Sequence, residues 1–236
     1  MSKLKPGVLG TFTGKTGRVV VVRYRGELVG RSEPSPSTKL PTKKQLDHQK
    51  KFGLMTSFFG KLTKAINMGY NRKSKVNGTN AAVSDHLKTA VYGSYPDYQI
   101  DYSKVNVTKS GNGFHGGFRV SLESAAETTV TVNWNALDSD EQIPGTAGPT
   151  DLANVVFYNV NKRKGVFNFG EAERKARTAS YQLPFQYVGD EFHAYLFFTS
   201  TDGKSTSTSD YLGSFILQEC PLDHEFTKKR DKKQIN

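Results

Sequence analysis

From about residue 97 onward, apolar and polar residues alternate along the chain, which is the period of a strand with one buried face. Residues 129–134 read TVTVNW, and short turn sequences such as 161–165 (NKRKG) separate one alternating segment from the next. The predicted strands cover residues 105–109, 118–122, 128–134, 155–160, 165–169, 178–183, 191–199 and 211–217. Many short strands within little more than a hundred residues predict an antiparallel β-sandwich.

The first forty residues have a different pattern. Glycine occupies positions 7, 10, 14 and 17, which predicts a loop or arm whose backbone adopts conformations closed to other residues. Residues 18–24 (RVVVVRY) predict a strand, and residues 28–32 a second strand that returns from a turn at Gly26. Residues 33–41 (EPSPSTKLP) form a proline-rich connector.

Helical spacing of apolar residues begins after this connector. Thr42 and Gln45 match a capping box, which predicts a helix over residues 42–70, although Gly53 and Gly60 weaken it. A second helix is predicted over residues 80–92, ended by Gly93. The predicted fold is therefore α+β and mainly β.

The net charge of the chain changes near residue 100, close to where the spacing of apolar residues changes from helical to alternating. Residues 1–100 hold 18 Lys and Arg against 5 Asp and Glu, a net charge of +13, whereas residues 101–236 hold 15 against 17, a net charge of −2. We expect three parts: a basic N-terminal region (1–100), the sandwich (101–220) and a charged tail (221–236). The basic region would face nucleic acid or an acidic protein, unless its charge serves only solubility.

The sequence contains only incomplete versions of the motifs that bind nucleotides or metal ions. Gly10 and Gly14-Lys15-Thr16 resemble a phosphate-binding loop, but three residues separate the glycines where that loop needs four, and a strand follows instead of a helix. The five histidines lack metal-binding spacing, and the single cysteine, Cys220, excludes an intrachain disulfide. We therefore predict no enzymatic activity, no catalytic residue, no cofactor, no metal site and no small-molecule substrate.

Two groups of residues are singled out instead. The lone tryptophan, Trp134, is expected in the sandwich core, and an exposed position that stacks on sugar is the alternative. The predicted core contains Val130, Val132, Trp134, Val156, Tyr195 and Phe197. The predicted assembly arm contains Gly7, Gly10, Gly14, Lys15, Gly17, Arg18, Val19, Val20, Val21 and Val22.

Three features resemble an uncharacterised family encoded by Bacteroidota. The first is the pattern G-x-x-G-x-x-x-G-K-x-G from Gly7 to Gly17. The second runs from Pro41 to Tyr102 and includes Tyr-Pro-Asp-Tyr at 95–98, and the third combines residues 170–174 with 210–213. That resemblance implies no catalytic residues. The C-terminal half separately resembles fibronectin type III and immunoglobulin-like modules, on strand count and Trp134.

The functional hypothesis is a non-enzymatic structural protein, specifically a multi-copy component of a bacteriophage tail, neck or connector. No apolar segment follows the basic start, so we expect cytoplasmic synthesis without a signal peptide, no membrane insertion and later incorporation into the virion. The expected partners are other copies of the chain and other structural proteins. One alternative is a cell-surface or secreted adhesion or carbohydrate-binding module, and another is a nucleic-acid-associated protein that acts through the basic half.

Overall fold

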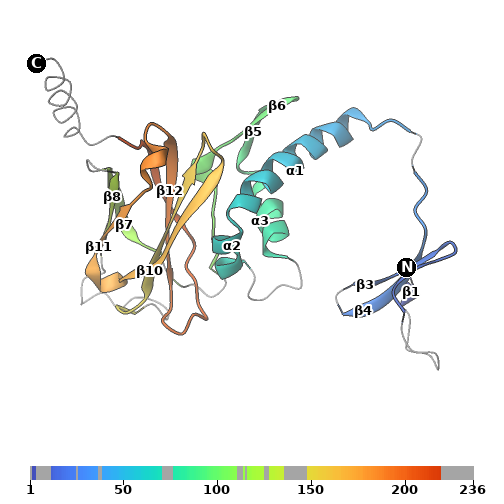
Figure 1. Cartoon of the computed structure of the whole chain (residues 1–236), viewed down its shortest axis with the longest axis horizontal. Helices are drawn as coiled ribbons and strands as arrows, with labels where there is room; N and C mark the ends of the chain where they lie inside the picture. Colours follow the sequence, from blue (N-terminus) through green and yellow to red (C-terminus); the bar gives the residue numbers. More distant parts are fainter. Residues whose placement is uncertain are drawn as a thin grey trace, which may run out of the picture. The chain divides into compact units, whose positions relative to one another are not determined.

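The computed structural model describes residues 2–3, 12–24, 26–36, 39–70, 77–110, 114, 116–124, 128–135 and 148–218. The chain divides into two compact units, Met1–Leu46 and Asp47–Asn236 (Figure 1). The charged tail 221–236, Gly7 and Gly10 lie outside the described residues, as do His115, Cys220 and His224.

The N-terminal unit contains a four-stranded antiparallel sheet. Its strands are β1 (Ser2–Lys3), β2 (Gly14–Thr16), β3 (Val19–Tyr24) and β4 (Glu27–Ser32), in the order β1-β4-β3-β2. The predicted hairpin is confirmed as β3 and β4, whereas β1 and β2 were not predicted. Thr16 pairs with Val19, so Gly17 and Arg18 form a two-residue loop in which Gly17 has φ +60°, a conformation that favours glycine.

The predicted capping box is confirmed at the start of α1 (Lys43–Lys61). The Thr42 N–H donates to Gln45 Oε1 at 2.8 Å, and the Gln45 N–H donates to Thr42 Oγ1 at 3.3 Å. The single helix predicted for 42–70 is wrong, because the chain breaks at Leu62 into α1 and α2 (Thr63–Gly69). Gly53 and Gly60 stay within α1, so the break occurs at buried Leu62 rather than at a glycine.

The helix predicted for residues 80–92 is only half right. Helix α3 (Gly78–His86) ends early, and a hairpin of β5 (Val91–Ser94) and β6 (Asp97–Ile100) follows. Gly93 does not cap a helix: it lies in β5 with φ +98°, and a Cβ there would meet the Asp97 carbonyl oxygen at 2.6 Å. This close approach of two backbones requires glycine.

The remaining strands form the predicted sandwich. One sheet has the order β11-β8-β7, from Thr178–Gln182 (β11), Thr129–Asn135 (β8) and Phe118–Ser124 (β7). The other has the order β10-β9-β12-β13, from Lys164–Glu173 (β10), Leu152–Asn159 (β9), Glu191–Thr199 (β12) and Asp210–Ile216 (β13). Short 3-10 helices occur at Tyr102–Lys104 (η1), Arg174–Ala176 (η2) and Phe185–Tyr187 (η3). Opposed sheets of three and four antiparallel strands make a fibronectin type III-like β-sandwich.

The strand predicted at 105–109 is wrong, although the alternating apolar residues that suggested it are buried. Val105 and Val107 are buried, but the segment joins no sheet. Its backbone is satisfied by side chains instead, since the Val107 N–H donates to Ser209 Oγ at 2.8 Å. The Thr108 hydroxyl likewise donates to the Ser207 carbonyl at 2.8 Å.

The β9–β12 sheet is buried on both faces. One face packs against the other sheet through a cluster that includes Trp134, Phe157 and Leu196. The opposite face packs against α1, α2 and α3 through a second cluster that includes Phe59 and Phe197 (Figure 1). The helices and the sandwich therefore belong to one compact unit. The boundary predicted near residue 100 stays a prediction about which parts fold independently.

Candidate functional site

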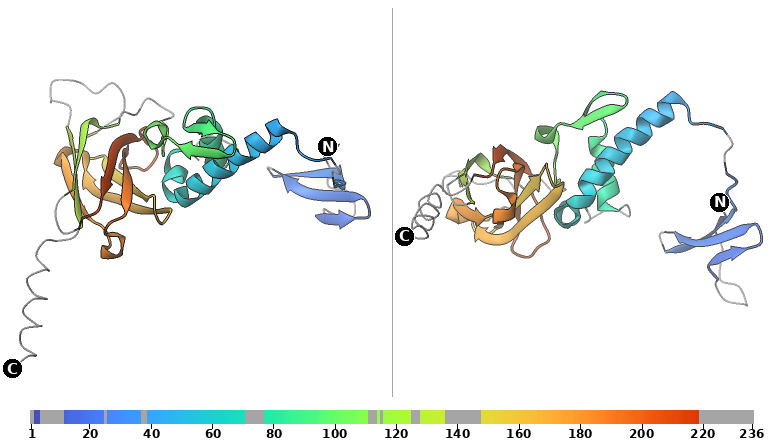
Figure 2. Two further views of the ribbon diagram at one scale, coloured as in Figure 1. Left: turned by 90° about the horizontal axis from the view of Figure 1, so that it is seen from above. Right: turned by 45° about the horizontal axis from the view of Figure 1, so that its top comes forward.

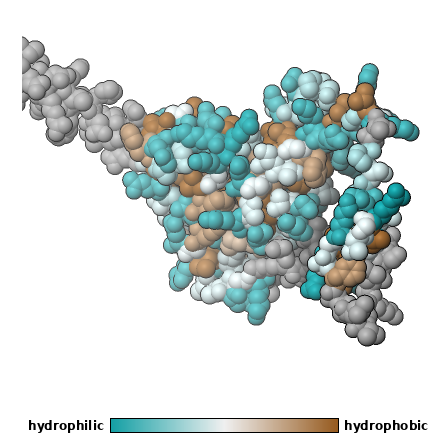
Figure 3. All heavy atoms as spheres, turned by 45° about the vertical axis from the view of Figure 1, so that its right-hand side comes forward, coloured by the Kyte–Doolittle hydropathy of each residue, from teal (hydrophilic) through white to brown (hydrophobic). Residues whose placement is uncertain are grey.

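The N-terminal sheet exposes large apolar side chains. Val19 is 48% exposed, Val22 38% and Tyr24 57%, and Phe12 just before β2 is 55% exposed. Because successive side chains alternate, Val19 lies on one face of β3, and Val22 and Tyr24 lie on the other. The space-filling view shows hydrophobic and hydrophilic residues intermixed on the molecular surface (Figure 3). Such a sheet offers a partner both apolar contact and two edge strands, β1 and β2.

The N-terminal segment that contains this sheet is strongly basic. Residues 1–46 hold ten Lys and Arg against two Asp and Glu, a net charge of +8. Lys15 lies in the middle of β2, where its Nζ approaches Glu33 Oε1 at 2.5 Å. Gly14–Thr16 is an extended strand and opens no helix, so these three residues do not adopt the geometry of a phosphate-binding loop.

Of the predicted arm, the structure describes Gly14, Lys15, Gly17, Arg18 and Val19–Val22. Gly14 and Lys15 lie in β2, Gly17 and Arg18 in the turn, and the four valines in β3. The sheet brings these residues together, with Lys15 paired opposite Val20.

The C-terminal unit contains a groove lined with aromatic side chains. Two hollows of about 490 and 520 Å³ lie side by side and share Tyr92, Ile100, Tyr102 and His193. The β5–β6 hairpin and η1 provide one wall, β9, β12 and β13 provide the other, and Leu54, Ser57 and Phe58 of α1 complete the lining. The hairpin lies beside α1 (Figure 2). There the Tyr98 hydroxyl donates to Asp47, and Lys51 lies over the Tyr98 ring at 4.8 Å.

A stacked pair of rings marks the meeting point of the two hollows. The Tyr102 and His193 rings are 4.0 Å apart at their centroids and 25° from parallel. His193 Nδ1 lies 2.8 Å from the Tyr211 hydroxyl, and the Tyr195 hydroxyl donates to the Tyr102 carbonyl at 2.9 Å. Desolvation lowers the pKa of His193, so the ring is neutral near pH 7. These contacts hold the ring pair in a fixed orientation.

Two tyrosine hydroxyls at the groove have no hydrogen-bond partner among the residues that the structure describes. Tyr158 is only 4% exposed, yet its hydroxyl makes no hydrogen bond within the described part of the chain. The same holds for the Tyr102 hydroxyl among the described residues, and burial raises the pKa of Tyr102 to about 12. Arg163 and Glu191 also line the groove, and both are exposed.

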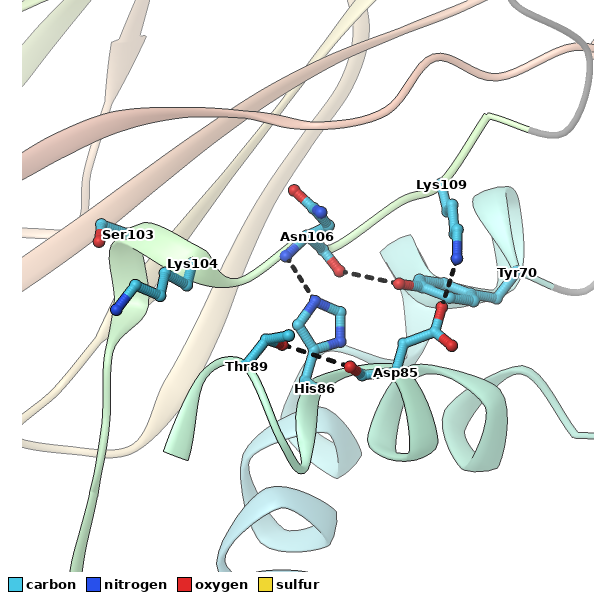
Figure 4. Close-up of a pocket in the computed structure, with 8 residues that line it drawn as sticks. All are labelled: Tyr70, Asp85, His86, Thr89, Ser103, Lys104, Asn106 and Lys109. Atoms are coloured by element: carbon cyan, nitrogen blue, oxygen red, sulfur yellow. Dashed lines mark hydrogen bonds and ion pairs between the residues drawn. The ribbon is translucent and has the colours of Figure 1, made fainter. Parts of the chain in front are cut away.

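A third hollow, of about 510 Å³, lies beside His86, whose contacts have a structural role (Figure 4). His86 is 3% exposed, and its Nδ1 lies 2.7 Å from the Ala82 carbonyl while its Nε2 accepts the Asn106 N–H at 2.9 Å. These two bonds require the neutral ring protonated on Nδ1. Desolvation accordingly lowers the pKa of His86. His86 therefore links segment 105–109 to α3 through hydrogen bonds.

A buried ionic cluster lies between the two sheets. The Arg174 side chain donates to the Gly116 carbonyl at 3.0 Å, lies 3.5 Å from Asp151 and covers the Phe198 ring at 4.0 Å. Asp210 accepts the Gly117 N–H at 2.7 Å and interacts electrostatically with Arg174. All these groups are engaged with the protein itself, so the cluster stabilises the sandwich rather than binding a ligand.

The six predicted core residues are all buried, but they divide between two cores. Val130, Val132 and Trp134 pack between the sheets, whereas the other three face the helices: Val156, Tyr195 and Phe197. Trp134 is 1% exposed and donates its Nε1–H to the Arg174 carbonyl at 2.7 Å, so it does not stack on a ligand.

The groove was missed by sequence reasoning. Its signal was the density of tyrosine at positions 92, 95, 98 and 102, of which only Tyr92 lies within the helix predicted for residues 80–92. The described residues contain no cluster of His, Cys, Asp or Glu suited to a metal ion. In the same part of the chain, no helix is long and apolar enough to cross a membrane.

The sequence comparison decides the family. Residues 11–213 match DUF6266, a family of unknown function. The chain belongs to this family. No catalytic family is indicated for this DUF6266 protein, and no curated protein matches its sequence.

Several solved structures are similar to less than half of this chain. A computationally redesigned β-sandwich protein has 12% identity and a TM-score of 0.31, with 45% of this chain and 92% of that chain covered. The fibronectin type III domain of human collagen α-1(XX) has 12% identity and a TM-score of 0.30, covering 46% and 89%. That of human contactin 1 has 7% identity and a TM-score of 0.30, covering 48% and 85%.

Proposed function

We propose that this DUF6266 protein is a non-enzymatic assembly protein that attaches to an acidic protein surface through its N-terminal sheet. The observation that carries the proposal is the exposure of Val19, Val22 and Tyr24 on a small basic sheet, together with Phe12 just before it. Exposed apolar side chains that gather on one element are typical of interaction sites. A small four-stranded sheet with exposed apolar residues on both faces is stabilised when a partner covers it and buries this apolar surface.

Charge selects the kind of partner. The net charge of +8 on residues 1–46 disfavours the pairing of two such sheets from different copies, and favours an acidic surface. Exposed apolar side chains favour a protein surface over a nucleic acid, since the phosphate backbone offers charge without apolar contact.

At a finer level, we propose that the protein is a multi-copy component of a bacteriophage tail, neck or connector, with the virion as its final location. The resemblance of the N-terminal motif to proteins of Bacteroidota directs the search to phages of that phylum. The chain order supports this: a basic sheet, a proline-rich connector and a sandwich allow one end to attach while the other forms contacts between copies.

The test uses particles from the bacterium that encodes the gene. The full chain and a chain without residues 2–32 replace the native copy, and purified particles are analysed by quantitative mass spectrometry. We expect the full chain in particles at a fixed ratio to other components, and the folded truncated chain absent. Absence of the full chain from every particle fraction contradicts the virion role. Equal incorporation of the truncated chain contradicts attachment through the sheet.

A matched pair of variants separates the sheet from the general surface. Val22→Ser with Tyr24→Ser removes apolar area from β3, and Phe185→Ser with Ile216→Ser removes exposed apolar area from the C-terminal unit. We expect only the first pair to reduce incorporation. Zero-length carbodiimide crosslinking should then join lysines of residues 1–46 to Asp or Glu of the partner.

Nucleic-acid binding through the basic half is the second candidate, and the net charge of +8 favours it. It predicts binding to duplex DNA that weakens steeply between about 50 and 200 mM salt. It also predicts no effect of Val22→Ser with Tyr24→Ser, because neither residue carries charge.

A further inference from the structure

We propose that the aromatic groove between the β5–β6 hairpin, η1 and the β9–β12 strands binds a neutral saccharide. The inference is independent of the N-terminal sheet, because every residue that lines the groove lies in the unit Asp47–Asn236.

Aromatic rings supply the platform for such a ligand. Tyr92 is 53% exposed at the rim, and its hydroxyl donates to Gln99 Oε1 at 2.7 Å, which fixes the ring. The stacked Tyr102 and His193 rings lie where the two hollows meet. A sugar ring presents apolar C–H groups on its faces, and these pack on aromatic rings while its hydroxyls remain at the edge.

The Tyr158 hydroxyl points to a ligand most directly. The side chain is more than nine-tenths buried and lines the groove, and its hydroxyl has no partner in the described part of the chain. The hydroxyl is not among the fully buried unpaired atoms of the described residues, so it opens onto the groove, where its hydrogen-bond partner is water or a ligand. A sugar hydroxyl both donates and accepts, so it satisfies this group whichever way the phenol proton points.

The charges of the groove favour a neutral ligand. Arg163 and Lys104 are balanced by Asp101 and Glu191, and the Lys104 Nζ lies 2.8 Å from Asp101 Oδ2. The planar groups of Arg163, Glu191 and Gln99 can each make paired hydrogen bonds to neighbouring hydroxyls of one sugar. Neighbouring hydroxyls on one sugar ring match the spacing of these planar groups, so the groove favours a neutral hydroxylated ligand. A proline-rich peptide such as the chain's own residues 33–41 is the competing occupant in the test.

The test titrates the full chain with hexamers of five neutral glycans: β-1,4-glucan, α-1,4-glucan, xylan, mannan and chitin. Isothermal titration calorimetry measures affinity, and amide chemical shifts locate the site. Polygalacturonate and the peptide of residues 33–41 serve as the acidic and peptide probes. We expect at least one neutral hexamer to bind, with shifts confined to residues 54–58, 91–104, 158–163, 191–193 and 211.

Three variants test whether the saccharide binds in the groove. Tyr92→Ala should weaken binding about tenfold through loss of stacking. Tyr158→Phe, which keeps the ring and its packing, should weaken binding about fivefold through loss of one hydrogen bond. Phe185→Ala, which removes an exposed aromatic residue outside the groove, should leave the affinity unchanged. Circular dichroism checks that each variant is folded.

The proposal is overturned if none of the neutral hexamers binds at millimolar concentration. It is equally overturned if binding survives both Tyr92→Ala and Tyr158→Phe unchanged, or if only polygalacturonate or only the 33–41 peptide binds at these residues.

Discussion

Replacement of Trp134 tests the packing between the two sheets of the sandwich. Its indole is 1% exposed, packs edge-on against Phe198 with ring centroids 5.8 Å apart, and donates to the Arg174 carbonyl at 2.7 Å. Trp134→Ala removes the whole indole from a dense core, which costs about 3–5 kcal/mol. It also leaves the Arg174 carbonyl without its donor, at a further cost of about 1–3 kcal/mol.

The sum approaches the whole stability of a typical domain, about 5–15 kcal/mol. Trp134→Phe is the more informative change, because it keeps one ring and removes the donor and part of the volume. We expect a loss of about 2–3 kcal/mol for Phe, roughly half of the loss for Ala. Urea unfolding followed by far-ultraviolet circular dichroism measures both variants, since neither retains tryptophan fluorescence.

The wild-type chain provides the control, because its fluorescence comes from this one tryptophan. A buried indole predicts blue-shifted emission that moves to the red on unfolding. Emission typical of solvent-exposed tryptophan, or a loss below about 0.5 kcal/mol for Trp134→Phe, would refute the reasoning.

Three further predictions follow from other contacts. Gly69→Ala should destabilise the chain by more than about 1 kcal/mol, because the new Cβ would meet Thr108 Cβ at 2.6 Å, and thermal melting measures this. Burial lowers the pKa of His86, so the folded chain binds a proton at His86 less readily than the unfolded chain does. The free energy of unfolding should therefore fall as the pH drops below about 6.5. Urea midpoints measured against pH check this, and His86→Gln should give a flatter profile. Residues 47–218 should melt cooperatively, whereas residues 103–217 should expose the apolar face that the helices cover and aggregate on size-exclusion chromatography.

The strands of the sandwich were readable from sequence because their alternation and turns are local signals. Strand β12 was predicted with its observed bounds, Glu191–Thr199. The cover provided by the helices was not predicted, although its signal is present. In β9 and β12, consecutive residues such as Val155 and Val156 are both buried, and an unbroken apolar run is typical of a strand buried on both faces.

Segment 87–100 shows where local reasoning fails. Residues 87–92 were predicted to end a helix, but the pairing of β5 with β6 and the positive φ of Gly93 place residues 91–100 in a hairpin. The groove was beyond local reasoning for a different reason. Tyr102 and His193 are 91 positions apart in the sequence, and only the packing of η1 on β12 brings their rings together.

The most direct test of the central claim is the thermal stability of a chain without residues 2–32. If the N-terminal sheet serves attachment and contributes little to the chain's own core, the truncated chain should unfold cooperatively within a few degrees of the full chain. Loss of the cooperative transition, or a melting temperature lowered by more than about 10 °C, would show that the sheet completes the chain's own core and contradict the account.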